Sequence, residues 1–253
     1  MGKLEIRDLN QSFAKDDGSR LVVLDHVTFD VKDKEFVCLL GSSGCGKTTL
    51  LRMIAGLDTA ESGSIVLDGT EIRGTSPKVG MVFQEYSLFP WRTVIDNIAF
   101  GLEMQGMPKA ERYRIAEHYL RLVNLTQFRD SYPNELSGGM RQRVAVARAL
   151  ALDPVLLLMD EPFGALDAQT RNMLQQELLE IQEKTKKTVI FITHSVDEAV
   201  YLSDRIIVLT PRPGRISRIL PVDLPRPRDR TSPEFAQLRR EVLDLINQNS
   251  STQ

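Results

Sequence analysis

The residues best suited to chemistry form one glycine-rich stretch, Gly41 to Thr48, which reads Gly-Ser-Ser-Gly-Cys-Gly-Lys-Thr. It matches the phosphate-binding loop pattern of two glycines followed by a lysine and a hydroxyl residue. Glycines let the backbone bend so that successive N–H groups point at phosphate oxygens, and the following helix adds its positive end. We therefore predict that this loop holds phosphate, that Lys47 reaches the β- and γ-phosphates, and that Thr48 holds Mg²⁺ through its hydroxyl.

A pair of carboxylates, Asp160 and Glu161, directly follows an apolar run, Val155 to Met159, which has the length of a buried strand. Charged groups are costly to leave at such a position. Asp160 is suited to organise Mg²⁺ through its water shell, and Glu161 to polarise the water that attacks the γ-phosphate. The alternative is a helix-capping aspartate and a solvated glutamate, and the phosphate-binding loop upstream favours catalysis.

Two more polar side chains stand where predicted strands end. Gln84 follows an apolar strand over 79–83, and its amide offers an oxygen to Mg²⁺ or to an attacking water. The alternative for Gln84 is a strand-end residue that faces solvent. His194 follows a strand over 188–193; a lone histidine there is usually structural, but ligands gather at this edge of open α/β sheets. We therefore expect His194 to share an edge with the phosphate-binding loop and Glu161.

A second helix start is also suited to bind an anion. Ser137, Gly138 and Gly139 stand directly ahead of a helical pattern, and serine is a good N-cap. Glycines and a helix N-terminus attract anions, although the same residues fit a capped helix with a glycine turn. Farther along, Asp167 precedes an amphipathic pattern and fits a simple helix cap.

An aromatic residue and a thiol leave alternatives open. Phe13 precedes a loop-like stretch over 15–19, where its ring could stack on an adenine, but the residues alone favour a core phenylalanine. Cys45 lies among N–H donors near Lys47, which fits a reactive thiol or an inert small residue equally well. Cys38 and Cys45 do not form a disulfide framework.

The elements that must position these residues alternate between strands and helices, which predicts an α/β fold. Strands are expected over 4–7, 22–31, 36–40, 64–67, 79–83, 155–159, 188–193, 205–209 and 216–220. The stretch from Thr93 to Leu125 is mostly helical, and Pro108 begins a new helix within it. A stripe of Ile115, Tyr119 and Leu122 is expected to face the core. A short final helix opens at Ser232-Pro233 and is expected to pack on the body.

Composition narrows the classes of function. The chain has 253 residues and a formal net charge of −2, which argues against a general nucleic-acid binder. No apolar run approaches the roughly 20 residues that span a bilayer, and the N-terminus lacks an apolar signal core. These patterns lead us to expect a chain that stays in the cytosol.

Taken together and in this order, the motifs resemble the ATP-binding-cassette (ABC) ATPases over nearly the whole chain. The resemblance implies a P-loop NTPase core of the RecA-like kind, with an antiparallel β subdomain and an inserted α-helical subdomain. It implies one ATPase domain over residues 1–230, with the helical subdomain at about 88–150, and a C-terminal helix and tail over 231–253.

The resemblance also assigns roles. It makes Leu136–Met140 the family signature, Gln84 the Q-loop residue, and His194 the switch histidine at the γ-phosphate, and it reverses the core interpretation of Phe13 in favour of adenine stacking. The implied catalytic residues are Lys47, Gln84, Glu161 and His194, and the implied Mg²⁺ ligands are Thr48, Gln84 and Asp160. The implied ATP-binding residues are Phe13, Gly41, Ser42, Ser43, Gly44, Cys45, Gly46, Lys47, Thr48, Thr49, Ser137, Gly138, Gly139 and Asp167. Two residues depart from the family pattern: Met140 stands where glutamine is usual, and Gly164 where serine is common.

In this family two cassettes pair head to tail, so ATP held by Lys47 of one copy is closed by Ser137 and Gly139 of the other. A homodimer and a heterodimer with a second cassette are both compatible with the sequence. The leading expectation is the ATP-hydrolysing subunit of a membrane importer, held at the cytoplasmic face by a separate permease that docks near Gln84 and Leu88–Trp91. A solute-binding protein would act indirectly, and no nucleic acid is expected.

Three stretches are similar to the nitrate, sulfonate, taurine and bicarbonate importer group: Leu88–Trp91 with Thr93-Val94, Thr210–Arg215, and Leu224–Arg228. The alternative is a soluble mechanical ATPase of the chromosome-maintenance kind or a translation-associated one, but the coiled-coil insertions or second cassette typical of those are missing. A nucleotide-binding regulator without turnover is disfavoured by Glu161 and His194.

Overall fold

The computed structural model describes residues 4–16 and 18–251. The chain forms two compact units. The first unit comprises the chain up to Ser76 together with everything from Thr188 onward, and the second runs from Pro77 to Lys187. Each unit carries part of the predicted site, so each is described by itself.

The first unit contains two groups of strands. An antiparallel sheet has the order β2-β1-β4-β5 and consists of β1 (Leu4–Ala14), β2 (Arg20–Val31), β4 (Ser62–Leu67) and β5 (Thr70–Glu71). The other group has the order β10-β9-β3-β8 and consists of β3 (Phe36–Leu40), β8 (Thr188–Thr193), β9 (Arg205–Leu209) and β10 (Ile216–Pro221). β3 runs parallel to β8 and β9, and β10 pairs antiparallel with β9, as the predicted closing hairpin requires.

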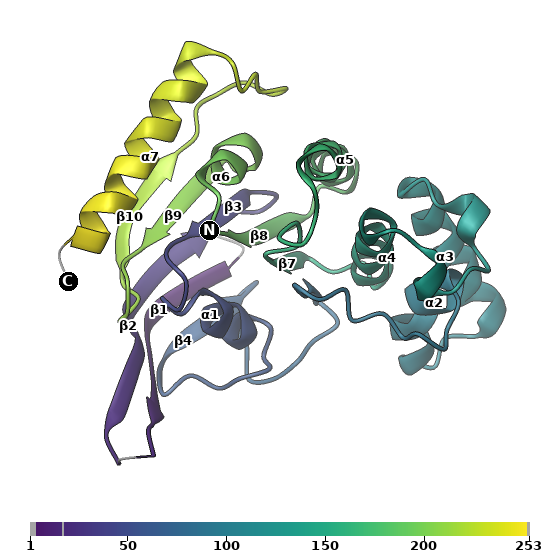
Figure 1. The fold of residues 1–253 in the computed structure, drawn as a ribbon. Coiled ribbons are helices and arrows are strands. Elements are labelled where there is room, and N and C mark those ends of the chain that lie inside the picture. The colour runs from purple at the N-terminus through teal and green to yellow at the C-terminus, as the bar shows by residue number, and fades with distance from the viewer. Residues whose placement is uncertain (1–3, 17, 252–253) are drawn as a thin grey trace. The chain divides into compact units, whose positions relative to one another are not determined.

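Three helices belong to the first unit: α1 (Lys47–Ile54), α6 (Val196–Leu202) and α7 (Pro233–Ser251). Figure 1 shows α7, in yellow, beside β10 and α6. Its apolar face is buried, since Phe235 and Val242 are almost completely covered. The predicted C-terminal helix is therefore confirmed, and it is longer than expected.

The second unit combines a strand pair with helices. The parallel strands are β6 (Val79–Val82) and β7 (Leu156–Asp160). The helices are α2 (Val94–Met104), α3 (Lys109–Leu122), α4 (Gly138–Ala151) and α5 (Ala168–Thr185), with 3₁₀ turns at Thr126–Phe128 and Pro133–Glu135. α2, α3 and α4 pack against one another, at the right of Figure 1.

Burial follows the strand type. Every residue of β3, β7 and β8 is buried, which is typical of parallel strands covered on both faces and agrees with their continuous apolar sequences.

The apolar stripe predicted on α3 is wrong in its phase. Ala116 and Leu120 are fully buried, whereas Ile115, Tyr119 and Leu122 are only partly covered.

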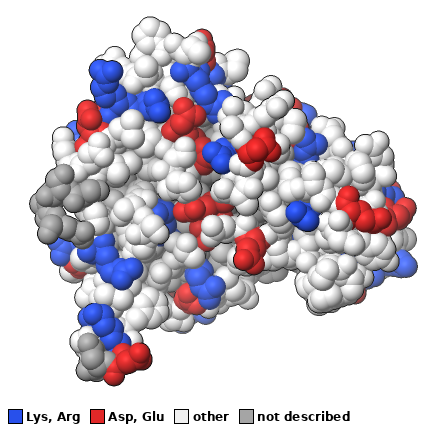
Figure 2. All heavy atoms as spheres, in the orientation of Figure 1, with Lys and Arg blue, Asp and Glu red and all other residues white. Residues whose placement is uncertain are grey.

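The surface is mixed in charge. Figure 2 shows lysine and arginine interspersed with aspartate and glutamate over the visible face. Within residues 4–16 and 18–251, no helix is both long enough and apolar enough to cross a membrane.

Candidate nucleotide-binding site

The glycine-rich loop joins β3 to α1 in the first unit. Gly44 and Gly46 have positive φ angles of 76° and 102°, a region that glycine adopts without strain. A Cβ atom on Gly46 would lie 2.7 Å from the Leu24 Cδ2 atom, so space is also lacking for any larger residue. The bend that aims the loop amides therefore depends on glycine, as predicted.

Lys47 is the first residue of α1, and its side chain is 5% exposed. Its ammonium donates hydrogen bonds to the carbonyl oxygens of Gly41 at 2.8 Å and Ser42 at 3.0 Å. Gly46 gives the helix no side-chain cap, and the first N–H groups of a helix have no partner within it. A bent loop, an inward cation and an uncapped helix start fit a polyphosphate.

Cys45 lies inside this loop. Its side chain is 1% exposed, and its Sγ atom would be only 2.8 Å from a Cβ atom on Gly41. Burial raises the pKa of the Cys45 thiol, and the nearby Lys47 ammonium only partly opposes that shift. A buried, protonated thiol is a poor nucleophile, which favours the inert alternative for this residue. Cys38 is also a free, buried thiol.

The turn between β9 and β10 supports the same loop. Arg212 Nε donates to the Gly44 carbonyl oxygen at 3.1 Å. A Cβ atom on Gly214 would lie 2.2 Å from the Cys45 carbonyl oxygen, so the two backbones are in close contact. The sequence predicted a hairpin turn here but not its contact with a loop more than a hundred residues away; its glycine was the only available signal.

His194 leaves the sheet at the same edge as the loop. β3 and β8 are parallel neighbours, and Leu40 pairs with Thr193, so Gly41 and His194 are the next residues on each strand. The side chain of His194 is exposed. Within the first unit, the structure thus brings together the loop and the histidine as predicted.

Phe13 lies near the end of β1, where it pairs with Leu21 of β2. Its side chain is 46% exposed, so the interpretation as a core phenylalanine is wrong. An exposed aromatic face is what stacking on a nucleotide base requires.

In the second unit, Gln84 and the carboxylates leave one strand edge together. β6 and β7 are parallel, and Val82 pairs with Met159, so Gln84 and Asp160 lie just beyond that pair. Asp160 is 7% exposed, Gln84 is exposed, and Glu161 is partly buried.

Glu161 has a positive φ angle of 43°, in a turn closed by the Gly164 N–H donating to the Glu161 carbonyl oxygen at 3.1 Å. A residue other than glycine in this region costs about 1–2 kcal/mol. Such strain gathers at functional sites, where it fixes the direction of a side chain. The strained backbone of Glu161 agrees with its predicted role, and eight other described non-glycine residues also have positive φ angles.

The glycines of the second anion-ready turn lie close to neighbouring side chains. Ser137 caps α4, since its Oγ accepts the Met140 N–H at 3.3 Å. Cβ atoms on Gly138 and Gly139 would lie 3.1 Å from the Tyr86 hydroxyl and 2.9 Å from Thr170 Cγ2. Ser137 itself is exposed.

Asp167 caps α5, and its carboxylate accepts the Thr170 N–H at 3.0 Å. That backbone hydrogen bond holds the pKa of Asp167 below its usual value. The Asp167 side chain is exposed, so it can cap α5 and also contact another molecule.

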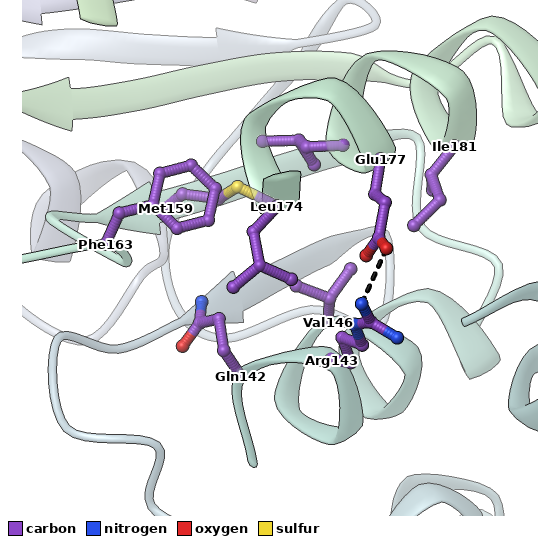
Figure 3. Close-up of a pocket in the computed structure, with 9 residues that line it drawn as sticks. Gln142, Arg143, Val146, Met159, Phe163, Leu174, Glu177 and Ile181 are labelled. Carbon is purple, nitrogen blue, oxygen red and sulfur yellow. Dashed lines mark hydrogen bonds and ion pairs between the residues drawn. The ribbon is translucent and has the colours of Figure 1, made fainter. Parts of the chain in front are cut away.

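A small apolar pocket lies behind the carboxylate segment, between α4, α5 and the end of β7 (Figure 3). Met159 and Phe163, which flank Asp160 and Glu161, form one wall. The Arg143 guanidinium and the Glu177 carboxylate pair at 2.6 Å on the opposite side. Sequence reasoning missed this pair, which ties α4 to α5 and so supports the segment between them.

The donor set fits Mg²⁺ bound together with a nucleotide. Among the described residues there is no cluster of three or more histidine, cysteine or acidic side chains that could hold a metal alone. The first unit offers the Thr48 hydroxyl and the second the buried Asp160 carboxylate, and both are oxygen groups of the kind by which proteins commonly bind Mg²⁺ together with a triphosphate.

Comparison with known proteins agrees with this geometry. The model of the ABC transporter family matches residues 24–164. An uncharacterized ABC transporter ATP-binding protein of Methanocaldococcus jannaschii, MJ0412, is 57% identical over 96% of this chain and 91% of the relative. The nitrate import ATP-binding protein NrtD of Synechocystis is 48% identical over 96% of this chain and 94% of the relative.

A solved structure is also similar. It is the dimeric post-hydrolysis ATP-binding cassette MJ0796 bound to ADP and Pi, with 31% identity, a TM-score of 0.76, and coverage of 87% of this chain and 98% of that one. The chain belongs to the ABC transporter family. It is an ATPase subunit that uses ATP with Mg²⁺, which confirms the predicted fold class, activity and cofactors.

Proposed function

We propose that this chain hydrolyses ATP to power the import of a small oxyanion such as nitrate. The observation that carries the proposal is the 48% identity to a nitrate import ATP-binding protein along nearly the full length of both chains. The stretches Leu88–Trp91, Thr210–Arg215 and Leu224–Arg228, which resemble the same importer group, agree with it. The mechanical ATPase alternative has no similar support.

In the proposed site, the amides of Gly41–Thr48 and the Lys47 ammonium bind the phosphates, and Phe13 stacks on the adenine. Thr48, Asp160 and Gln84 would hold Mg²⁺, which supplies positive charge beside the phosphate oxygens. The inward position of Lys47 and the exposed ring of Phe13 support these assignments.

Hydrolysis proceeds by in-line attack of water on the γ-phosphate. Glu161 orients that water and accepts its proton, and His194 contacts the γ-phosphate. Lys47 offsets the charge that develops on the transferred group, and this offset is worth most where water is excluded. The strained backbone of Glu161 supports a fixed direction for its carboxylate.

A second cassette completes each site in this proposal. Ser137, Gly139 and Asp167 of one copy face the nucleotide held by the other, in a homodimer or a heterodimer. The exposed positions of Ser137 and Asp167 and the dimeric state of the similar cassette MJ0796 support the arrangement. ATP then holds the pair closed, and hydrolysis releases it.

The permease is proposed to dock on the stretch after Gln84. Trp91 is 72% exposed, and its ring lies 5.7 Å from that of Phe89. The buried Asn97 amide fixes this stretch: its Oδ1 accepts the Phe89 N–H at 2.8 Å, and its Nδ2 donates to the Arg92 carbonyl at 3.0 Å. A preorganised apolar side chain suits an interface anchor. The chain would then lie at the cytoplasmic face of the membrane, with a solute-binding protein acting indirectly.

We propose that the ATPase domain extends over residues 1–230, with helices inserted at about 88–150, followed by the helix and tail of 231–253. The helices α2 to α4 support the inserted part. Residues 1–3, 17, 252 and 253 lie outside the described part of the chain.

The test is to purify Glu161→Gln from its native cells in mild detergent with ATP and Mg²⁺. We expect this variant to bind ATP, to stall before hydrolysis and to retain its partners. Recovery of a multi-spanning membrane protein would support the importer, and the neighbouring solute-binding protein would then be screened against small oxyanions. Recovery of soluble or nucleic-acid-associated partners alone would support the mechanical ATPase instead, and wild-type turnover would contradict the role of Glu161.

A further inference from the structure

Thr193 and Ser195, which flank His194 in the chain, are joined through the Thr193 hydroxyl group. Thr193 Oγ1 accepts the Ser195 N–H at 3.0 Å and donates to the Glu198 carboxylate at 2.5 Å. Thr193 is 1% exposed and Glu198 is 7% exposed, so these bonds are shielded from water. A hydrogen bond to a charged acceptor in such a place is among the stronger ones in proteins.

The burial of Glu198 is unusual, since carboxylates are rarely buried in proteins unless another group pairs with them. Its backbone N–H also bonds to the Ser195 hydroxyl at 3.4 Å, which caps α6. The sequence Ser195 to Glu198 predicts a capping box, in which the glutamate returns to the N-cap backbone. In the structure the Glu198 carboxylate accepts a hydrogen bond from Thr193, one residue before His194.

The helix that carries Glu198 is itself fixed. The buried Arg228 guanidinium donates to the carbonyl oxygens of Val200 at 2.8 Å, Tyr201 at 3.0 Å and Ser203 at 2.7 Å, at the end of α6. Arg230 pairs with Asp197 at 2.9 Å and lies 3.7 Å from the centre of the Tyr201 ring. Arg228 and Arg230, in the segment after β10, thus hold α6 in place. The position of Glu198 on α6 is therefore fixed relative to the turn over 193–195.

His194 lies between Thr193 and Ser195, and its side chain is exposed. The backbone of residues 193–195 therefore sets the point from which the imidazole extends. Thr193 also pairs with Leu40, the residue before the glycine-rich loop. The shared hydroxyl holds the turn at the point where β8 runs beside the start of that loop.

We propose that Thr193 and Glu198 are positioning residues for ATP hydrolysis: the Thr193 hydroxyl, held by the Glu198 carboxylate, sets the turn that presents His194 to the γ-phosphate. The inference rests on the proposed role of His194. A displacement of about 1 Å in a reacting group can cost up to about 100-fold in rate. ATP binding is carried by the loop over 41–48, so losing the hydroxyl lowers kcat and leaves the KM for ATP unchanged.

The test compares Thr193→Val with Thr193→Ser in the full chain, by steady-state phosphate release over a range of ATP concentrations. Valine keeps the branched shape and removes the hydroxyl, whereas serine keeps the hydroxyl. We expect kcat of Thr193→Val to fall about 10- to 100-fold at an unchanged KM, and Thr193→Ser to stay near wild type. Glu198→Gln keeps an acceptor oxygen and should lose little, whereas Glu198→Met should behave like Thr193→Val.

Urea unfolding of each variant separates positioning from stability, since a merely structural role lowers the unfolding midpoint without a selective loss of kcat. His194→Ala is the reference. If His194→Ala is inactive while Thr193→Val turns over like wild type, or if Thr193→Ser loses as much as Thr193→Val, the positioning role is overturned. If His194→Ala itself turns over like wild type, the proposed role of the histidine has failed, and the positioning role fails with it.

Discussion

Two helices of this chain begin at glycine-rich turns, and the two beginnings differ. α1 follows Gly46, which provides no side-chain cap, and its first residue, Lys47, turns its ammonium back onto the loop carbonyls. α4 follows Ser137, whose hydroxyl already accepts the Met140 N–H. The first turn of α4 does contain a cation, Arg141, but its guanidinium lies over the ring of Tyr86.

The difference teaches which turn can bind an anion by itself. The start of α1 combines a helix N-terminus without a side-chain cap, a left-handed bend and its own buried cation, so we expect it to bind phosphate by itself. The start of α4 has used one N–H for its cap, and its glycines lie close to the side chains of Tyr86 and Thr170. It is suited to add contacts to a nucleotide that another surface already holds, which agrees with the proposed pairing of two copies.

The largest effect is expected from removing the cation of the first turn. Lys47→Ala should reduce ATP turnover at least about 100-fold, because the charge that develops on the γ-phosphate loses a preorganised partner. Phosphate release measures turnover, and the fluorescence of a labelled ATP measures binding. An unchanged unfolding midpoint is the control. Turnover close to that of the wild type would show that the first turn is not the primary phosphate site.

Mixing two damaged chains tests whether the turns serve one nucleotide from different copies. Ser137→Ala should turn over about 10-fold less than wild type but bind ATP as a single chain normally, since its own phosphate loop is intact. A mixture of Ser137→Ala with Lys47→Ala should regain turnover, because each mixed pair contains one site with both residues present. The matched control mixes Lys47→Ala with a chain that carries both substitutions, which restores no site. A mixture that gives only the mean of its two components would contradict the pairing.

The two turns also show which features can be predicted from the sequence. The glycine-rich loop, the strand-end residues and the helix caps were predicted because each depends on a few neighbouring residues whose chemistry is local. Long-range contacts were not predicted, such as Arg212 on the Gly44 carbonyl. Gly214 indicates a turn near position 212, but no residue there identifies a partner so distant in the chain.

Two local predictions also show the limit of pattern reasoning. Strand alternation cannot tell which end of a long strand runs into solvent, so Phe13 was taken from its residue context as core, although it is 46% exposed. Ser195 and Glu198 have the spacing of a capping box and Ser195 does cap α6, but that spacing does not reveal that the Glu198 carboxylate accepts from the buried Thr193 hydroxyl. In both cases the residue types allow more than one arrangement, and only the three-dimensional structure shows which one occurs.

The two turns should respond differently to an added methyl group. Gly46→Ala places a side chain at a φ of 102° and against Leu24, so we expect a loss of about 2–4 kcal/mol in the free energy of unfolding. Gly139→Ala meets the Thr170 methyl closely and Leu174 at an ordinary contact distance, and it gains helix propensity, so its net cost should be about 0–2 kcal/mol. Urea unfolding of both variants measures the difference. Equal losses would mean that the first turn is no more strained than the second.

The smallest effect concerns the thiol that only the first turn contains. Because burial raises the pKa of Cys45, less thiolate is present at neutral pH, and alkylation by iodoacetamide should be slower than for a cysteine peptide. The thiolate fraction grows with pH, so the rate profile should rise at a higher pH than that of the peptide. Mass spectrometry of the modified chain measures the rate at position 45, with the fully buried Cys38 as the slow reference. ATP should slow the reaction further, because it closes a loop that must open to admit the reagent. Rapid alkylation at neutral pH would mean that the first turn opens readily without nucleotide, and its phosphate site would then be organised by ATP rather than complete beforehand.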